Sequence, residues 1–91
     1  MRCLITYDLA EPNDTPDDYE AVIHAIKLLY PEHNHMQYSV FLVTTASSAA
    51  KVRDALQMFI KGDSSLFVTP IRGWSSYKLS KDTTAWLERT E

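Results

Sequence analysis

Cysteine and glycine are both scarce in this sequence of 91 residues, and each scarcity excludes a class of structure. Cys3 is the lone cysteine, so the chain cannot form an internal disulfide, and a single thiol of this kind fits a reducing compartment. Gly62 and Gly73 are the two glycines, which leaves no glycine-rich loop to cradle a phosphate. We therefore expect no nucleotide cofactor and no other organic cofactor.

A basic excess and long apolar runs are also missing. The formal net charge is −3, which weighs against a strong general nucleic-acid binder, since such proteins usually present a basic face. The basic residues lie mostly in the second half of the chain. This distribution is compatible with a mildly basic patch and equally with ordinary solvated surface. No stretch approaches the roughly 18 apolar residues of a membrane span, and the first apolar run stops at Asp8. We expect a soluble cytoplasmic protein with no membrane partner.

The apolar segments alternate between strand and helix patterns along the chain. Strands are expected over residues 2–8, 33–38, 40–45 and 65–71, and helices over residues 16–30 and from Ser47 or Ser48 to Gly62. Thr15 is expected to cap the first helix, Pro16 suits its first position, and Pro31 ends it. This order is the split βαβ pattern of an α+β, ferredoxin-like fold (βαββαβ), in which a four-stranded antiparallel sheet carries two helices on one face.

The chain divides into a ferredoxin-like core over residues 1–72 and a C-terminal tail over residues 73–91. The tail is expected to run extended past Trp74 and Tyr77 and then to form a short helix from about Lys81. Its apolar side would be formed by Ala85, Trp86 and Leu87. We expect the tail to pack on the core or on a partner subunit.

The strands predict that both faces of the sheet are buried, although two helices can cover one face alone. Residues 3–5, 40–43 and 66–68 are continuously apolar, which is typical of strands covered on both sides. The available covers are a second copy of the sheet, packed face to face, and the C-terminal tail. The tail looks too short to cover four strands, so we expect a homodimer in which the tail seals the rim or reaches onto the partner subunit.

Several short motifs resemble known families. The first strand ends in Tyr7-Asp8-Leu9, and Gln37-Tyr38-Ser39-Val40-Phe41 joins the two middle strands. Both resemble the small CRISPR-associated adaptation nucleases, the second of the numbered Cas proteins. The segment from Leu66 to Ile71, followed by Gly73-Trp74, is more similar to related SinR-like proteins, and the virulence-associated protein D toxins are similar in outline. The similarity covers about residues 2–74.

The resemblance implies a ferredoxin-like homodimer in which the aspartate that ends the first strand lies near the dimer axis. Paired carboxylates from the two subunits would there hold a magnesium ion, and Asp8 is the residue that matches this position. Asp8 is accordingly the candidate catalytic residue and metal ligand. Magnesium prefers oxygen ligands and keeps several waters, so one carboxylate from each subunit would suffice beside substrate phosphates. Glu11 and Asp14 in the following loop could supplement them.

Other residues carry weaker signals. His33 and His35 lie two apart on a short strand and share a face, which is compatible with zinc, but no further ligands are visible and a surface role is favoured. Trp74, Tyr77 and Trp86 could stack on bases, although burial against the sheet or a partner is favoured.

Three hypotheses for function follow. The first is a homodimeric CRISPR-adaptation-like or toxin-like protein, a magnesium-dependent endonuclease of endoribonuclease type or a nucleic-acid-binding subunit, which acts on RNA or DNA through Asp8. The second is a non-catalytic dimer that binds another protein in a phage-defence, counter-defence or toxin–antitoxin system. The third is a purely structural dimer without a ligand.

Overall fold

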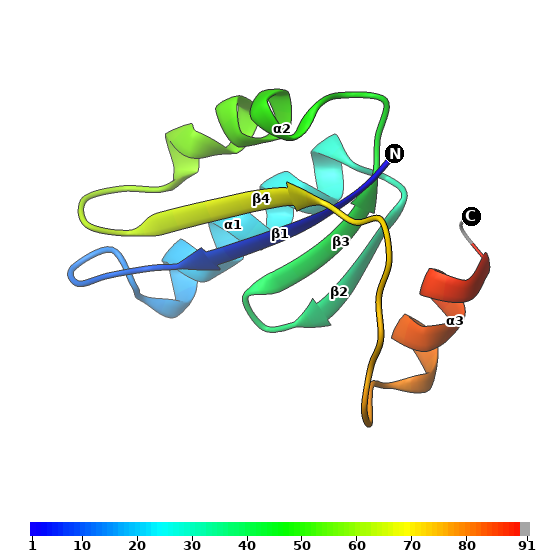
Figure 1. The fold of residues 1–91 in the computed structure, drawn as a ribbon. Coiled ribbons are helices and arrows are strands. Elements are labelled where there is room, and N and C mark those ends of the chain that lie inside the picture. The colour runs from blue at the N-terminus through cyan, green and yellow to red at the C-terminus, as the bar shows by residue number, and fades with distance from the viewer. Residues whose placement is uncertain (90–91) are drawn as a thin grey trace.

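The computed structural model describes residues 1–89, which form one four-stranded sheet and three α-helices (Figure 1). In chain order, the elements are β1 (Arg2–Asp8), α1 (Pro16–Leu29), β2 (His33–Gln37), β3 (Val40–Thr44), α2 (Ala49–Leu56), a 3₁₀ turn η1 (Gln57–Phe59), β4 (Ser65–Pro70) and α3 (Lys81–Arg89). The strand order is β2-β3-β1-β4, and every neighbouring pair is antiparallel. The expected α+β, ferredoxin-like βαββαβ fold is confirmed, with α1 and α2 on one face of the sheet.

Both helices of the core begin at side-chain caps that the sequence indicates. Thr15 Oγ1 accepts a 3.2 Å hydrogen bond from the backbone N–H of Asp18, whose carboxylate accepts a 3.1 Å bond from the N–H of Thr15. This reciprocal capping box satisfies amide groups that the first helical turn leaves without partners. Of the two serines proposed for α2, Ser48 is the cap, because its Oγ accepts from the N–H of Lys51 at 3.2 Å.

The first layer of the core lies between the sheet and the helices α1 and α2. Side chains alternate along a strand, so Cys3, Ile5 and Tyr7 of β1 all point into this layer. Their buried neighbours from the other elements include Val22, Ile26, Phe41, Val43, Val52 and Leu56. Burial of each such side chain is worth roughly 1.5–3 kcal/mol, so this layer supplies most of the apolar stabilisation of the domain.

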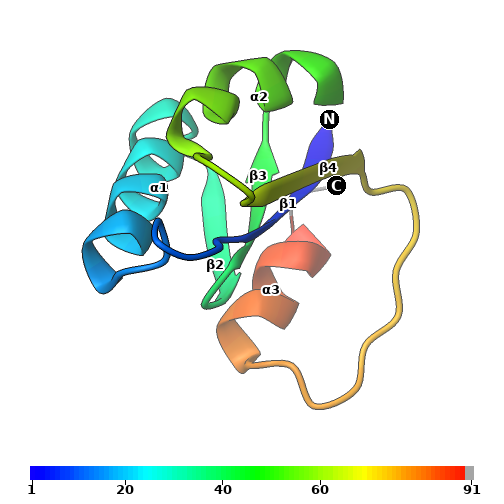
Figure 2. The same cartoon turned by 90° about the vertical axis from the view of Figure 1, so that its left-hand side faces the viewer.

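The opposite face of the sheet, called here the second face, is partly covered by α3 of the same chain (Figure 2). Trp86 and Leu87 of α3 form a buried cluster with Leu42 of β3, and Leu4 and Met36 pack against it. Within this chain the tail packs on the core, on the side of β2 and β3, which is one of the two placements that the sequence leaves open. Leu87 and Trp86 form the apolar side of α3 as expected, whereas Ala85 is exposed and does not belong to it.

Polar contacts fasten α3 to the sheet in addition to this apolar cluster. Thr83 is 2% exposed, and its Oγ1 donates a 2.7 Å hydrogen bond to Oδ1 of Asn34 in β2. Ser80 Oγ donates in turn to Thr83 Oγ1 at 3.0 Å. The chain between β4 and α3, called here the linker (residues 71–80), has no regular secondary structure and arcs away from the sheet (Figure 2).

Candidate functional site

Asp8 is the last residue of β1 and lies opposite Ser65 of β4. It shares the second face with Leu4 and Thr6, since side chains two and four positions apart on a strand point the same way. Asp8 is exposed, and among residues 1–89 no side chain bonds to its carboxylate. Both carboxylate oxygens are therefore available to a ligand on the second face.

Tyr7 holds the end of β1 in place on the opposite side of the sheet. Its backbone N–H donates to the carbonyl of Ser39 at 3.2 Å, and its hydroxyl donates to the carbonyl of Tyr38 at 3.1 Å. Burial raises the pKa of the Tyr7 hydroxyl well above its usual value, and the neighbouring Tyr38 and Tyr19 add to this shift. Tyr7 thus stays a protonated donor that ties the end of β1, next to Asp8, to the turn between β2 and β3.

The loop after β1 carries two further carboxylates that are close to Asp8 in the sequence. Its path is fixed where the N–H of Ala10 donates to Ser64 Oγ at 2.8 Å. Glu11 and Asp14, the proposed supplementary ligands, are both exposed in this loop. Within residues 1–89, no group of three or more His, Cys, Asp and Glu side chains converges on one point. The described part of one chain therefore offers no metal site built from three or more such side chains.

The carboxylate of Asp8 is suited to supply one half of a magnesium site, with the other half from a second copy of the chain. Its carboxylate offers the hard oxygen ligands that Mg²⁺ takes, and its exposure leaves room for the waters that this ion retains. Proteins bind Mg²⁺ with one or two carboxylates together with substrate phosphates, so two copies of Asp8 would meet that need. The donor set of this chain is thus compatible with the ion when two chains meet at the second face.

The part of the second face next to Asp8 is apolar and lies beyond the reach of α3. Thr6 pairs with Val40 on one side and with Phe67 on the other, and directly opposed residues share a face. Phe67 is 60% exposed, and Thr6 and Val40 are half-buried. We call these three residues the open half of the second face. An exposed phenylalanine on the edge strand β4 is typical of a surface that another molecule covers.

The two strand histidines serve packing and backbone contacts. The His35 ring stacks on Phe41 with centroids 4.1 Å apart, and His33 meets the same ring edge-on at 6.0 Å. His33 Nδ1 lies 2.7 Å from the carbonyl of Tyr30, and His35 Nε2 lies 2.9 Å from the carbonyl of Tyr38. They share a face as predicted. His35 is exposed and His33 is half-buried, so the favoured surface role holds in part, and both rings also pack on the buried side chain of Phe41.

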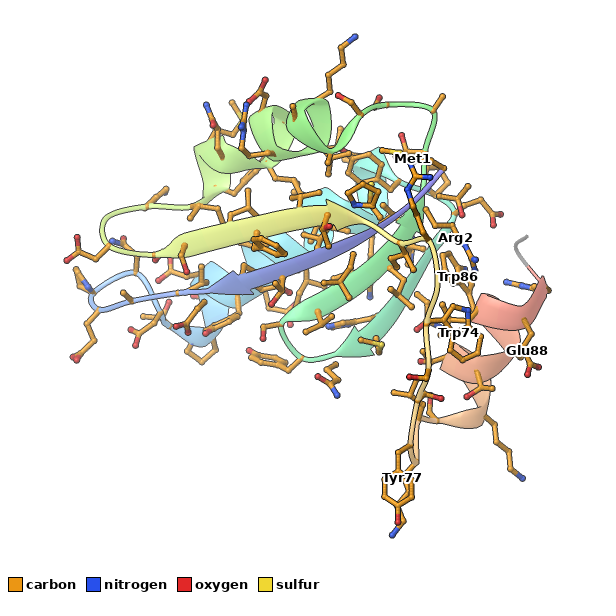
Figure 3. All side chains as sticks on the ribbon, in the orientation of Figure 1. Met1, Arg2, Trp74, Tyr77, Trp86 and Glu88 are labelled. Carbon is orange, nitrogen blue, oxygen red and sulfur yellow. The ribbon has the colours of Figure 1, made fainter. Side chains whose placement is uncertain are left out.

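The three aromatic residues of the tail differ in exposure. Trp86 is buried at 3% exposure, as expected from packing against the sheet. Trp74 and Tyr77 belong to the linker and are 41% and 84% exposed, so the expected burial against the sheet does not hold for them within this chain (Figure 3).

Comparison with known proteins gives one family. Over the part of the chain that the structure describes, no helix has the length and apolar character needed to cross a membrane. A search of curated proteins finds no match. The family model described as CRISPR associated protein Cas2 matches residues 1–79, which include β1, Asp8, the whole sheet and nearly all of the linker but not α3. This match, over most of the chain and in agreement with the observed fold, shows that the protein belongs to the CRISPR associated protein Cas2 family.

Proposed function

We propose that this protein is a cytoplasmic, homodimeric subunit of CRISPR adaptation that cleaves nucleic acid with a magnesium ion held by Asp8 of both subunits. The observation that carries the proposal is the position of Asp8 at the edge of the open half of the second face. Membership of the Cas2 family supports the link to CRISPR adaptation.

Pairing of two sheets through the open half would bury exposed apolar side chains and would bring two Asp8 carboxylates toward each other. Phe67 and Val40 would lose their exposure to water, which stabilises the pair by roughly 25 cal/mol for each Å² of apolar surface removed. A twofold axis through this surface would place the same patch of both copies in contact. Asp8 lies beside that patch, so each subunit would bring one carboxylate toward the axis.

The chemistry then divides between the ion and the chain. When bound, magnesium would polarise a phosphoryl oxygen and stabilise the charge that develops in phosphodiester cleavage. Asp8 would hold the ion, and the hydrogen bond from Tyr7 to Tyr38 would keep the end of β1 from moving. Residues 9–20, which follow Asp8, contain no Lys or Arg, so contacts to phosphates are expected from other parts of the chain.

A nuclease assay with matched carboxylate variants tests the proposal. The full chain is incubated with labelled single-stranded RNA, single-stranded DNA and duplex DNA, in magnesium and in EDTA. Asp8→Asn removes the proposed ligand, and Asp14→Asn removes an exposed carboxylate from the following loop as the control. We expect magnesium-dependent cleavage that falls about 100-fold or more in Asp8→Asn, because the ion supplies several kcal/mol to such reactions.

The control variant should cleave as the wild type does. Equal activity of Asp8→Asn and the wild type would contradict the assignment of Asp8. If a dimeric wild-type protein cleaved none of the substrates, catalysis would be overturned in favour of a non-catalytic dimer that binds another protein.

A further inference from the structure

Ser65, the first residue of β4, lies directly opposite Asp8 in the antiparallel pair of β1 and β4. Figure 1 shows the C-terminal end of β1 beside the start of β4. Directly opposed residues share a face of the sheet, and their Cβ atoms are about 4.5–5.5 Å apart. Leu66 packs on the core beneath the helices, so the alternation along β4 places Ser65 on the second face together with Asp8.

The hydroxyl of Ser65 is available to a group on the second face. Ser65 is exposed, and over residues 1–89 its Oγ makes no hydrogen bond. The preceding serine differs, because Ser64 Oγ accepts a 2.8 Å hydrogen bond from the N–H of Ala10. Ser64 therefore has a structural contact within the chain, whereas nothing in the described fold uses the side chain of Ser65.

The backbone at this end of the sheet is fixed, so Asp8 and Ser65 stay side by side. The bond from Ala10 to Ser64 lies immediately beyond the last pair of β1 and β4 and extends their connection into the loops. Further out, the loops still touch, since a Cβ added to Gly62 would lie 2.9 Å from Nδ2 of Asn13. A site whose side chains stand on a fixed backbone holds its geometry without further ordering.

Other side-chain donors near Asp8 in the sequence are less well placed. Thr6 is on the same face of β1, but residues two apart on a strand are separated by about 6.8 Å along it. The hydroxyl of Tyr7 lies on the opposite side of the sheet and donates to the carbonyl of Tyr38 at 3.1 Å. Residues 9–20 contain no Lys or Arg. Among these candidates, the strand register brings Ser65 nearest to the Asp8 carboxylate.

A carboxylate that binds a metal ion is commonly held by a second hydrogen-bonding group, which orients it toward the ion. A hydroxyl that donates to an ionised carboxylate makes a short, charge-assisted bond. The spacing of an opposed pair allows this bond between Ser65 and Asp8 through rotation of two exposed side chains, without movement of the backbone.

We propose that Ser65 is a positioning residue of the Asp8 site, whose Oγ–H donates to one oxygen of the Asp8 carboxylate and leaves the other oxygen for the magnesium ion. The inference rests on the proposed function, because it assigns a further residue to that site. In the proposed dimer, each subunit would contribute one such serine beside its own aspartate.

Binding of Mn²⁺, measured by electron paramagnetic resonance, tests the inference without reference to activity. Mn²⁺ is suited to the same oxygen ligands as Mg²⁺, and its free form gives a signal that is lost on binding. We expect Ser65→Ala to weaken Mn²⁺ binding by the full chain about ten-fold or more, as loss of such supporting groups does. Ser65→Thr keeps the hydroxyl and should bind as the wild type does. The matched control is Ser75→Ala, which removes an exposed serine of the linker.

Rescue by metal provides a second readout that a merely structural role would not give. In the nuclease assay, higher Mg²⁺ concentrations should restore most of the cleavage by Ser65→Ala, because affinity for the ion is impaired and the ligand itself is still present. The same concentrations should not restore cleavage by Asp8→Asn, which lacks the ligand. Light scattering should give the same mass for Ser65→Ala and the wild type.

The outcomes separate this inference from the proposed function. If Asp8→Asn lost Mn²⁺ binding while Ser65→Ala bound as tightly as the wild type, the role of Ser65 would be overturned and the Asp8 site would stand. If the wild type bound no Mn²⁺, or if Asp8→Asn bound it equally well, both would be overturned. Equal losses in Ser65→Ala and Ser65→Thr, or a single-chain mass for Ser65→Ala, would also overturn the positioning role.

Discussion

The Nη1 atom of Arg2, at the start of β1, donates a 2.7 Å hydrogen bond to the backbone carbonyl of Leu87 in α3, 85 residues further along the chain. Arg2 is buried at 6% exposure, so this charge-assisted bond lies out of water. It joins the central strand of the sheet to a helix that lies beyond the part of the chain matched by the Cas2 family. Arg2 thus adds to the contacts that hold α3 on the second face.

Replacement of Arg2 tests this connection. We expect Arg2→Met to lower the free energy of unfolding by about 1.5–3 kcal/mol, since a buried hydrogen bond to a charged group is lost and the Leu87 carbonyl is left without this donor. Hydrogen exchange measured by mass spectrometry should become faster in α3 of the variant than in α3 of the wild type. The corresponding change in β1 and β3 should be smaller. Lys51→Met, at an exposed position on α2, is the control and should change neither quantity. Unchanged exchange in α3 of Arg2→Met would contradict the role given to this contact.

The two glycines offer a matched pair of substitutions. Gly62 has a φ of 60°, and an added Cβ would lie 2.9 Å from Nδ2 of Asn13. We expect Gly62→Ala to lower the free energy of unfolding by about 1–2 kcal/mol, because L residues are strained in the left-handed region. Gly73 has open space around its Cα, so Gly73→Ala should cost less than about 0.5 kcal/mol. Urea unfolding compares the two, and equal losses would contradict this account of Gly62.

Alkaline pH should weaken the fold through buried protonated groups. Burial raises the pKa of the Tyr7 hydroxyl and of the Tyr30 hydroxyl, and burial also raises the pKa of the Cys3 thiol. The unfolded chain releases these protons more readily, so their contribution is fully present below the unfolded pKa values, about 8.5–10, and declines as the pH rises above them.

Tyr7→Phe separates the largest of these contributions. The variant loses the hydrogen bond to Tyr38, which costs about 1 kcal/mol near neutral pH, but its stability should fall less between about pH 10 and 12 than that of the wild type. Thermal unfolding followed over this pH range provides the measurement. Tyr77→Phe, at an exposed tyrosine, should follow the wild-type curve. A Tyr7→Phe curve parallel to the wild type throughout would show that Tyr7 does not carry the effect.

Local chemistry made most of the core predictable from the sequence. Thr15, Pro16 and Ser48 mark the beginnings of α1 and α2, and the apolar stripe of α1 identifies its buried side. The order of elements then leaves few topologies, because crossovers are right-handed and connections are short. Asp8 could be placed at the end of β1 from local sequence as well, because the apolar run of this strand stops there.

The second face was harder to predict, because a continuous apolar run does not say what covers each side. Val40 to Val43 is apolar throughout, yet Phe41 and Val43 pack beneath the helices, Leu42 packs under α3, and Val40 stays half-buried. The placement of α3 depends on contacts between residues far apart in sequence, such as Thr83 with Asn34, which no local pattern reveals. The exposure of Trp74 and Tyr77 follows from the same placement, because α3 covers the surface they were expected to cover.

The central claim is that the open half of the second face joins two copies of the chain beside Asp8. Size-exclusion chromatography with light scattering tests it on the wild type, on Phe67→Asp and on Met58→Asp, which changes an equally prominent apolar side chain in η1. We predict twice the chain mass for the wild type and for Met58→Asp, and the mass of a single chain for Phe67→Asp. A wild type that keeps the single-chain mass at high concentration, or a Phe67→Asp variant that remains dimeric, would contradict the account.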